Sequence, residues 1–441
     1  MPESLVSMRS ATSHASQSSI AATSMKANAQ SRRGIWWISP FGLIVGFLIP
    51  VFLLIMLLGE IRSPALTVRG IQYLDIGYSL GGIGLMALMA LAALVGQQVQ
   101  IKGGGTPVHE RNWAVAAWVI GLIGVFAYMV WFRKIFFSPA TLFGVLTGSI
   151  RMGREEISTA TGVSSLVNFM PVFFALFTHV LVTQPQKVSR SLRWLAISLL
   201  LLTIFRVYVW SERLAMIEIG VAVVVPFVCA KCGSMSPGSR RLVSLLPLIG
   251  LPLLILYFGV GEYFRSWQSD TYQGKMPFWE FAAGRFATYY YTSLNNGAGL
   301  LHTQNWPSFK FEHTLAFAYK APWIFGALFR YYSELDYSSM GYFLKKYADP
   351  EFNNPSGVYT VVYDLGVAGA MTYFSVLGFV SGFLYRAITD GRARGVLLFP
   401  LCFIMMLELY RYPYFGESRS FTAFLGVGLA LLIIGAKRKP G

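Results

Sequence analysis

Long apolar runs alternate with short polar segments along the whole chain, and this pattern indicates its structural class. Apolar runs of about 18 residues or more are typical of membrane-spanning helices, since a helix needs about 20 apolar residues to cross the hydrocarbon core of a bilayer. The pattern predicts an all-α polytopic membrane protein with roughly ten transmembrane helices, within a range of about ten to twelve. The expected spans are 36–58, 76–97, 113–132, 163–183, 194–210, 214–230, 242–260, 360–385, 396–410 and 420–436.

These spans divide the chain into four parts. Residues 1–34 are rich in serine and alanine with few large apolar side chains, so we expect a disordered cytoplasmic tail there. The next apolar run, from Ile35 to Gly59, is longer than a signal-peptide core and lacks a small-residue cleavage site, which indicates a retained span. We expect seven helices in residues 35–260, a large extracytoplasmic loop, and three helices with a short basic tail in residues 359–441.

Two further apolar segments are too short to be confident spans, and each contains a proline: Ile135 to Gly148 and Thr314 to Phe329. If both were full spans, the basic segments 187–193 and 231–241 would fall on the extracytoplasmic side, against the positive-inside rule. We therefore interpret both segments as re-entrant or interfacial. This interpretation places both termini in the cytoplasm.

Composition agrees with a membrane protein and clarifies the charge. The chain is 55% hydrophobic and only 13% charged, with a mean hydropathy of +0.53, whereas soluble proteins carry about 25% charged residues. The formal net charge of +16 could suggest a nucleic-acid partner. Because most of the lysines and arginines lie in short loops between spans, the charge instead follows the positive-inside pattern, and we expect no nucleic-acid partner.

The extracytoplasmic side is expected to carry the function. Its main segment, residues 261–358, is far longer than a connector, and loops of that length are usually functional. A smaller loop, residues 133–162, lies on the same side. Familiar signatures of soluble enzymes are absent from the sequence, including a P-loop, GxSxG and HExxH. The CAKC motif from Cys229 to Cys232 has no second pair, so we expect neither a metal site nor a cofactor.

Arginines are the most distinctive charged residues on the predicted outer side. Their guanidinium groups can bind diphosphate oxygens in a bidentate manner and stay charged at all relevant pH values. The alternative is that individual arginines reach lipid head groups or pair with nearby acids. The outer arginines are Arg133, Arg151, Arg154, Arg213, Arg265, Arg285, Arg330, Arg411 and Arg419, and the nearby acids are Glu155, Glu156, Glu212 and Glu417.

Arg206 is a special case because it lies inside an expected span, in the stretch LLTIFRVYVW. An unpaired cation at the centre of a span costs about 2.5–3.5 kcal/mol on insertion scales, so such a residue usually faces a cavity or a partner. Glu218 in the following span is the expected partner of Arg206. Either a structural ion pair or a role in substrate binding would explain this arginine.

Other outer residues suit a sugar substrate and acid–base chemistry. Tyr290 and Tyr291 lie in YYYTSLNNGAG, where aromatic faces and amides could bind pyranose rings, although an interfacial aromatic belt is the alternative. His302 and His313 could accept a proton, because histidine as a residue type has an unperturbed pKa near neutrality, or they could simply be solvated. Asp364 lies at the start of an apolar segment, where it could orient a hydroxyl, hold an arginine, or favour the helix N-terminus through the helix dipole.

The sequence resembles a known family at this point. The turn NNPSG is followed by YTVVYDLGVAGAMTYF, in which Tyr363, Asp364, Leu365, Gly366 and Gly369 form an aromatic–Asp–Leu–Gly–x–x–Gly signature. This signature, placed after a long outer loop in a multi-span chain, resembles bacterial O-antigen polymerases (Wzy-type oligosaccharide repeat-unit polymerases). The arginine in WSERLAMIEIG is also similar to a family feature.

The resemblance implies a glycosyltransferase of GT-C-like architecture in the bacterial inner membrane. Its substrate would be an undecaprenyl-diphosphate-linked oligosaccharide, whose glycan is transferred to the sugar of a new lipid-linked repeat unit at the periplasmic face. The arginines would bind the diphosphate and stabilise its developing charge, and Asp364, His302 or His313 would activate the acceptor hydroxyl. A chain-length regulator and a flippase are the implied protein partners.

Three other functions fit the same features. An O-antigen ligase would use the same donor with a different acceptor. Another polyprenyl-linked glycosyltransferase would carry acidic residues in its first outer loop, where Glu60 and Asp75 lie. A flippase or other transporter for lipid-linked oligosaccharides is the third alternative, and the sequence shows no evident inverted repeat to favour it.

Overall fold

The computed structural model describes residues 35–60, 71–99, 110–150, 152, 156–157, 159–160, 162–210, 212–263, 267, 277–321, 324–333, 338–348 and 351–436. All regular secondary structure in these residues is helical, in agreement with the all-α prediction. The first half contains α2 (Pro40–Leu43), α3 (Ile49–Glu60), α4 (Ile76–Gln98), α5 (Glu110–Trp131), α6 (Arg133–Phe136), α7 (Pro139–Thr147), α8 (Met170–Thr183), α9 (Arg190–Trp210) and α10 (Leu214–Lys231). The second half contains α11 (Pro237–Ser244), α12 (Leu246–Glu262), α13 (Phe278–Thr303), α14 (Ala316–Lys320), α15 (Ile324–Ser333), α16 (Ser339–Tyr347), α17 (Tyr359–Thr389), α18 (Ala393–Leu407) and α19 (Ser418–Gly435).

The multi-pass prediction is confirmed. Within the described residues, eight helices are long and apolar enough to cross a membrane, and a bent pair, Pro237–Ser244 with Leu246–Glu262, raises the number to nine. Each of the ten expected spans has a helical counterpart, but the one at 396–410 is α18, whose 15 residues make it shorter than a typical span. The 48° bend of the pair occurs just before Pro247, near the first turn of α12, where proline starts a new helix.

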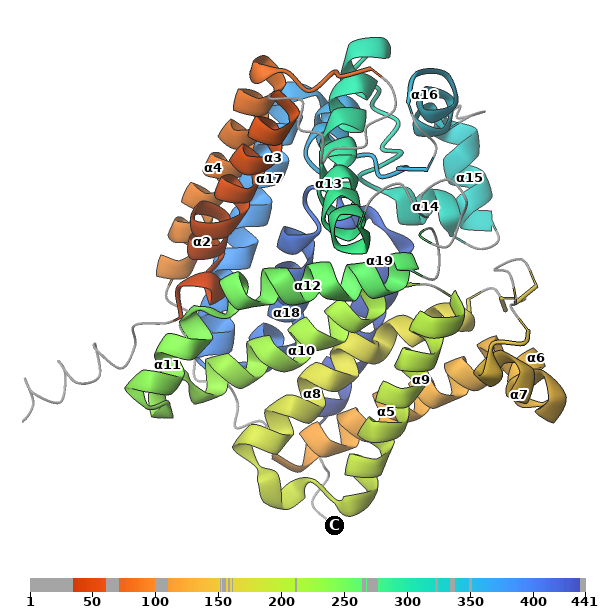
Figure 1. The fold of residues 1–441 in the computed structure, drawn as a ribbon. Helices are drawn as coiled ribbons and strands as arrows, with labels where there is room; N and C mark the ends of the chain where they lie inside the picture. The colour runs from red at the N-terminus through yellow and green to blue at the C-terminus, as the bar shows by residue number, and fades with distance from the viewer. Residues whose placement is uncertain are drawn as a thin grey trace, which may run out of the picture.

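The helices form two groups that meet at an angle (Figure 1). Helices α3, α4 and α17 stand side by side in the first group. The second group contains α5, α8, α9, α10 and α12, which run at an angle to the first. The short helices α14, α15 and α16 lie together at one end of the molecule with α13. The long loop predicted at residues 261–358 therefore contains helices, and the two short apolar segments form α6–α7 and α14–α15, none of which is long enough to span.

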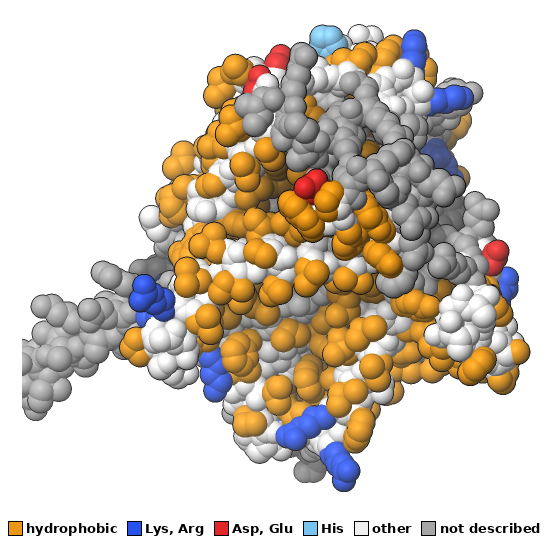
Figure 2. Space-filling view, viewed as in Figure 1, with side chains coloured by type: hydrophobic (Ala, Val, Ile, Leu, Met, Phe, Trp, Pro, Cys, Tyr) orange, Lys and Arg blue, Asp and Glu red, His pale blue; other side chains and the backbone are white. Residues whose placement is uncertain are grey.

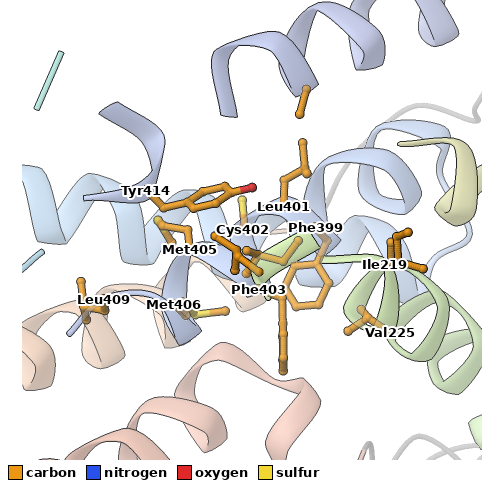
Figure 3. Packing of buried hydrophobic residues seen from close by; sticks show 14 of the residues in the cluster. Ile219, Val225, Phe399, Leu401, Cys402, Phe403, Met405, Met406, Leu409 and Tyr414 are labelled. Atoms are coloured by element: carbon orange, nitrogen blue, oxygen red, sulfur yellow. The ribbon is translucent and has the colours of Figure 1, made fainter. Parts of the chain in front are cut away.

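Helix α18 lies at the centre of the bundle. Almost all of its side chains are buried, and it contacts α8, α10, α17 and α19. Figure 3 shows Phe399, Cys402 and Phe403 of α18 in the interior, with Ile219 and Val225 of α10 to one side of them. Hydrophobic side chains cover the visible surface of the crossing helices, and basic side chains gather near α11 and the turn between α8 and α9 (Figure 2).

Helices α4 and α17 make the most extensive contact in the fold, and small residues permit it. A Cβ atom at Gly378 or Gly382 of α17 would overlap the backbone of α4, and one at Gly96 of α4 would overlap the backbone of α17. Gly378 and Gly382 are four residues apart, so they lie on one face of the helix. Such spacing lets two membrane helices approach closely and gain dispersion contacts.

Substituting this close contact is expected to destabilise the fold. Gly382→Val would push α17 away from the carbonyl of Ala93 and should lower the free energy of unfolding by about 1–3 kcal/mol through overpacking. The matched control is Gly84→Val in α4, where an added Cβ meets no atom within 4 Å. Thermal unfolding in detergent measures both variants, and equal melting temperatures would contradict the close packing.

Candidate functional site

A cavity of about 870 Å³ opens at the end of the bundle where α9 ends and α10 begins. Its wall also includes the second half of α12, the middle of α13, the turn before α17 and the turn between α18 and α19. The lining residues are Glu212, Arg213, Leu214, Ile217, Leu254, Tyr257, Phe258, Phe286, Tyr289, Tyr290, Lys320, Glu351, Asn353, Asn354, Pro355, Arg411, Tyr412, Glu417 and Arg419. Every one of these segments lies on the side predicted to be extracytoplasmic.

The structure brings four of the predicted site residues together in this cavity: Arg213, Tyr290, Arg411 and Arg419. Arg206 and Arg285 lie directly behind the wall, since each contacts a carboxylate that lines the cavity. Asp364, His302, His313, Tyr291 and Arg330 do not line it. The predicted site residues Arg151, Arg154 and Arg265 lie outside the described residues.

The first charged network connects Arg213 to Glu351 through two buried residues. Arg213 Nη2 donates to Glu262 Oε1 at 2.8 Å, and Arg285 Nε donates to Glu262 Oε2 at 3.1 Å. Arg285 Nη2 also contacts Glu351 at the cavity wall. The side chains of Arg285 and Glu262 are only 3% and 1% exposed. Loss of one partner from such a buried pair typically costs about 3–5 kcal/mol, so this network fixes the cavity wall.

Arg213 is positioned by more than its ion pair. It precedes the first residue of α10. Its Nη1 donates to the carbonyl oxygen of Phe258 at 3.2 Å, and its guanidinium carbon lies 4.0 Å from the centre of the Phe258 ring. The stacking places the guanidinium group against an aromatic face on α12, which favours a fixed orientation. Arg213 thus links α10 to α12 at the cavity.

The second charged network corrects the predicted partner of Arg206. Its Nε and Nη2 donate to Glu212 Oε2 at 2.8 and 2.5 Å, so Glu212, and not Glu218, is its hydrogen-bonding partner. Glu212 also contacts Arg419, whose Nη1 lies 3.2 Å from Glu218 Oε1. The hydroxyl of Tyr414 donates to the same oxygen of Glu218 at 2.8 Å. The sequence could not show which of the two acids pairs with Arg206, because the position of Glu212 depends on the conformation of the turn between α9 and α10.

Arg411 lies in the turn between α18 and α19 and is held from two sides. Its Nη1 donates to Glu408 at 2.6 Å and its Nη2 to the hydroxyl of Tyr289 at 2.8 Å. The guanidinium carbon lies 5.0 Å from the ring centre of Tyr289 and 5.2 Å from that of Tyr412. Burial acts to lower the pKa of Arg411, but Glu408 and the neighbouring tyrosines together outweigh burial and raise the pKa, so the residue stays a cation.

The cavity lining is also rich in aromatic and amide side chains. Tyr289 and Tyr290 come from α13, while Asn353 and Asn354 come from the turn before α17. Asn296 of α13 fixes that turn, because its Nδ2 donates to the carbonyl oxygens of Phe352 and Asn354 at 2.7 and 3.2 Å. Burial raises the pKa of Tyr290, so its phenol is neutral at physiological pH. Tyrosine faces with nearby amides can bind the faces and hydroxyls of a sugar.

Asp364 occupies a different place from the one its position in the sequence suggested. It is fully buried, and its Oδ2 accepts hydrogen bonds from the backbone N–H groups of His313 and Thr314 at 3.0 and 2.7 Å and from the Thr314 hydroxyl at 2.9 Å. Gly366 explains the geometry, since its φ of 71° and ψ of 177° interrupt α17. The carbonyls of Tyr363 and Asp364 then accept from the backbone N–H groups of Ser308 and Phe309.

This arrangement connects Asp364 to the cavity through the chain that it holds. The carbonyls of His313 and Thr314 pack so closely on Gly416 that a Cβ at Gly416 would overlap them. Gly416 precedes the cavity residues Glu417 and Arg419. We therefore assign Asp364 a positioning role in this structure, and its direct part in catalysis stays a prediction.

The remaining predicted residues are spread around the molecule. His302 is exposed near the end of α13, with its ring 5.6 Å from that of Tyr73, and His313 is buried next to Asp364. Tyr291 is buried on the other face of α13, close to Gly59 of α3. Arg330 is exposed on α15 and donates to the carbonyl oxygen of Tyr319 at 2.5 Å.

Sequence reasoning missed several cavity residues, chiefly Lys320, Glu351 and Tyr412. Lys320 Nζ lies 2.8 Å from Glu417 Oε2, an ion pair between α14 and the start of α19. A usable signal was the scarcity of acids: the chain has only 20, and six glutamates converge at this end of the bundle. These six are Glu212, Glu218, Glu262, Glu351, Glu408 and Glu417.

Comparisons with known proteins assign no family to the chain. No family model, no curated protein and no solved structure matches it.

Proposed function

We propose that this protein is a glycosyltransferase that polymerises polysaccharide repeat units, of the O-antigen polymerase type, in a bacterial inner membrane. The observation that carries the proposal is the cavity at the end of the membrane bundle, which combines Arg213, Arg411, Arg419 and Lys320 with a wall of tyrosines and asparagines. Guanidinium groups suit diphosphate oxygens, and the aromatic and amide wall suits a glycan. A substrate with both parts, at membrane level, is a polyprenyl-diphosphate-linked oligosaccharide.

The proposed reaction uses both the cationic and the aromatic and amide lining residues of the cavity. The bond between the anomeric carbon of the donor glycan and the diphosphate oxygen breaks, and the hydroxyl oxygen of an acceptor sugar forms the new bond to that carbon. The arginines would stabilise the negative charge that develops on the departing diphosphate. The acceptor hydroxyl loses its proton to a base, and Glu351 is well placed because it lines the cavity with its side chain 32% exposed.

The ion pairs around the cavity also suggest how a substrate would bind. Arg411 and Arg419 already contact Glu408, Glu212 and Glu218, so a diphosphate must compete with these carboxylates or share the guanidinium donors with them. Arginine can share its donors, because it has five N–H groups in a planar fork. Buried counterions of this kind hold the cations in place before the substrate arrives.

The test is deletion of the gene in the organism that encodes the chain, followed by gel analysis of its surface and lipid-linked glycans. Complementation uses the wild type, Glu351→Gln, and the control Glu280→Gln, since Glu280 is exposed in the first turn of α13. The proposal predicts glycan reduced to a single repeat unit on deletion, rescue by the wild type and Glu280→Gln, and loss of about 10²–10⁴-fold in activity for Glu351→Gln.

Other results would identify another function. Polymer that accumulates on its lipid carrier without reaching an acceptor would indicate a ligase. Lipid-linked repeat units trapped on the cytoplasmic side would indicate a flippase. Normal long chains after deletion would contradict the proposal.

A further inference from the structure

Helix α15 presents a largely exposed apolar face. Ile324, Phe325, Leu328 and Tyr331 are 71%, 76%, 46% and 77% exposed. Leu328 and Tyr331 follow Ile324 at i+4 and i+7, and Phe325 extends this stripe to an arc of about 120° at 3.6 residues per turn. Four large exposed side chains on a ten-residue helix indicate an interaction surface.

The rest of the α15 surface is partly packed on the protein and partly exposed. Gly326 is buried, and a Cβ there would overlap the carbonyl oxygen of Ala321. Phe329 packs its ring 4.7 Å from that of Tyr319. Arg330 extends from this surface and is exposed. The helix therefore has one apolar face and one face with a cation, which is the pattern of helices that lie at a membrane surface.

The helix that precedes α15 packs on a membrane span, and this contact indicates what covers the apolar face of α15. The preceding helix α14 packs on α19, where the rings of Phe317 and Phe421 stack 4.6 Å apart and 3° from parallel. Phe421 is itself 42% exposed near the start of α19, a candidate membrane span whose Leu425 and Leu432 are also exposed. The α14–α15 segment therefore begins against the lipid-facing side of a span.

Length excludes the alternative of a crossing helix. Ten residues of α-helix extend about 15 Å, half of the roughly 30 Å hydrocarbon core. A helix of this size with an apolar face is accommodated when it lies along the surface of the bilayer. Tyr331 on the same face suits this depth, because tyrosine is enriched at membrane–water interfaces.

We propose that α15 lies in the bilayer interface at the cavity end of the bundle, with Ile324, Phe325, Leu328 and Tyr331 inserted among lipid acyl chains. This inference does not depend on the proposed function. Lys320, the last residue of α14, forms an ion pair with Glu417, and this pair joins the α14–α15 segment to the cavity wall. Contact with the bilayer thus holds Lys320 at the cavity.

The test compares two positions on α15 in the full chain reconstituted in lipid nanodiscs. Phe325→Cys and Arg330→Cys are each spin-labelled in a background in which Cys229, Cys232 and Cys402 are replaced by alanine. Collision rates are measured with oxygen, which concentrates in lipid, and with a water-soluble nickel chelate. We expect the ratio of oxygen to nickel collisions to be at least about fivefold higher at position 325 than at 330, because only the first face enters the acyl region.

Two results would overturn the proposal. Equal oxygen-to-nickel ratios at both positions would contradict the proposal: low ratios would place the face in water, and high ratios would place both faces in lipid. Protection of position 325 from both reagents would mean that a protein covers it. If the cysteine-free chain is not monodisperse, the native chain with benzoylphenylalanine at position 325 replaces it. Ultraviolet cross-linking should then give phospholipid adducts by mass spectrometry, and adducts only to protein, or none to lipid, would contradict the proposal.

Discussion

An Arg411→Lys variant is expected to lose glycan polymerisation while it remains folded in the membrane. Lysine keeps the positive charge beside Glu408, so no buried carboxylate is left unpaired. It cannot form the fork that now reaches Glu408 and Tyr289 together and that would bind a diphosphate in a bidentate manner. Loss of one donor to a developing negative charge typically lowers a rate by about 10²–10³-fold. We expect the rate of polymerisation to fall by that order.

The matched control for this variant is Arg330→Lys. Arg330 is exposed on α15 and does not line the cavity, so its replacement should leave polymerisation within about twofold of the wild type, as surface substitutions usually have small effects. Both variants are quantified in the membrane fraction by immunoblot. Full polymerisation by Arg411→Lys at wild-type abundance would show that the fork has no role in the reaction.

An Asp364→Ala variant is expected to show the largest loss of stability. Two backbone N–H groups and one hydroxyl would lose their buried acceptor, and each buried unsatisfied donor costs about 1–3 kcal/mol. We expect the free energy of unfolding to fall by about 3 kcal/mol or more. Asp364→Asn keeps one oxygen at this site and should lose about 1 kcal/mol. Thermal unfolding in detergent and limited proteolysis near residues 308–320 measure the effect.

The control is another carboxylate of the same helix. Asp390 follows the last residue of α17, is exposed, and lies 3.2 Å from Arg386, so Asp390→Ala should change stability by no more than about 1 kcal/mol. A stable Asp364→Ala variant would contradict the positioning role. A fully stable Asp364→Asn variant without polymerising activity would instead support the original hypothesis of a catalytic carboxylate.

The membrane fold was predictable because its signal is long and repeated. Each apolar run is a direct consequence of bilayer thickness, and the helices found in the structure follow the expected spans within a few residues. The break between α11 and α12 was less accessible, because Pro247 starts a helix inside one apolar run. No boundaries were predicted for the helix α13 in the loop 261–358, since α13 is rich in small and polar residues and its packing against α12 and α16 is long-range.

The sequence indicates residue types for a site more readily than positions. Of the outer arginines, Arg213, Arg411 and Arg419 line the cavity, since all three lie at the same ends of spans. Lys320 and Glu351 were hard to select, because the scarcity of acids marks Glu351 only as one of 20 and no sequence pattern shows which part of a long loop folds back to a cavity. Asp364 was singled out correctly as unusual, but its partners Thr314 and His313 are fifty residues away in the chain, a contact set only by tertiary structure.

The most direct measurement of the central claim is a transfer reaction with the purified chain in nanodiscs. The substrate is a polyprenyl-diphosphate-linked repeat unit isolated from the deletion strain, and the products are analysed by mass spectrometry. We expect glycans of two or more repeat units, together with one released polyprenyl diphosphate for each new linkage. We expect neither product with Arg411→Lys. Unchanged substrate with the wild-type chain, under conditions where the substrate binds, would contradict the assignment of this cavity to glycan polymerisation.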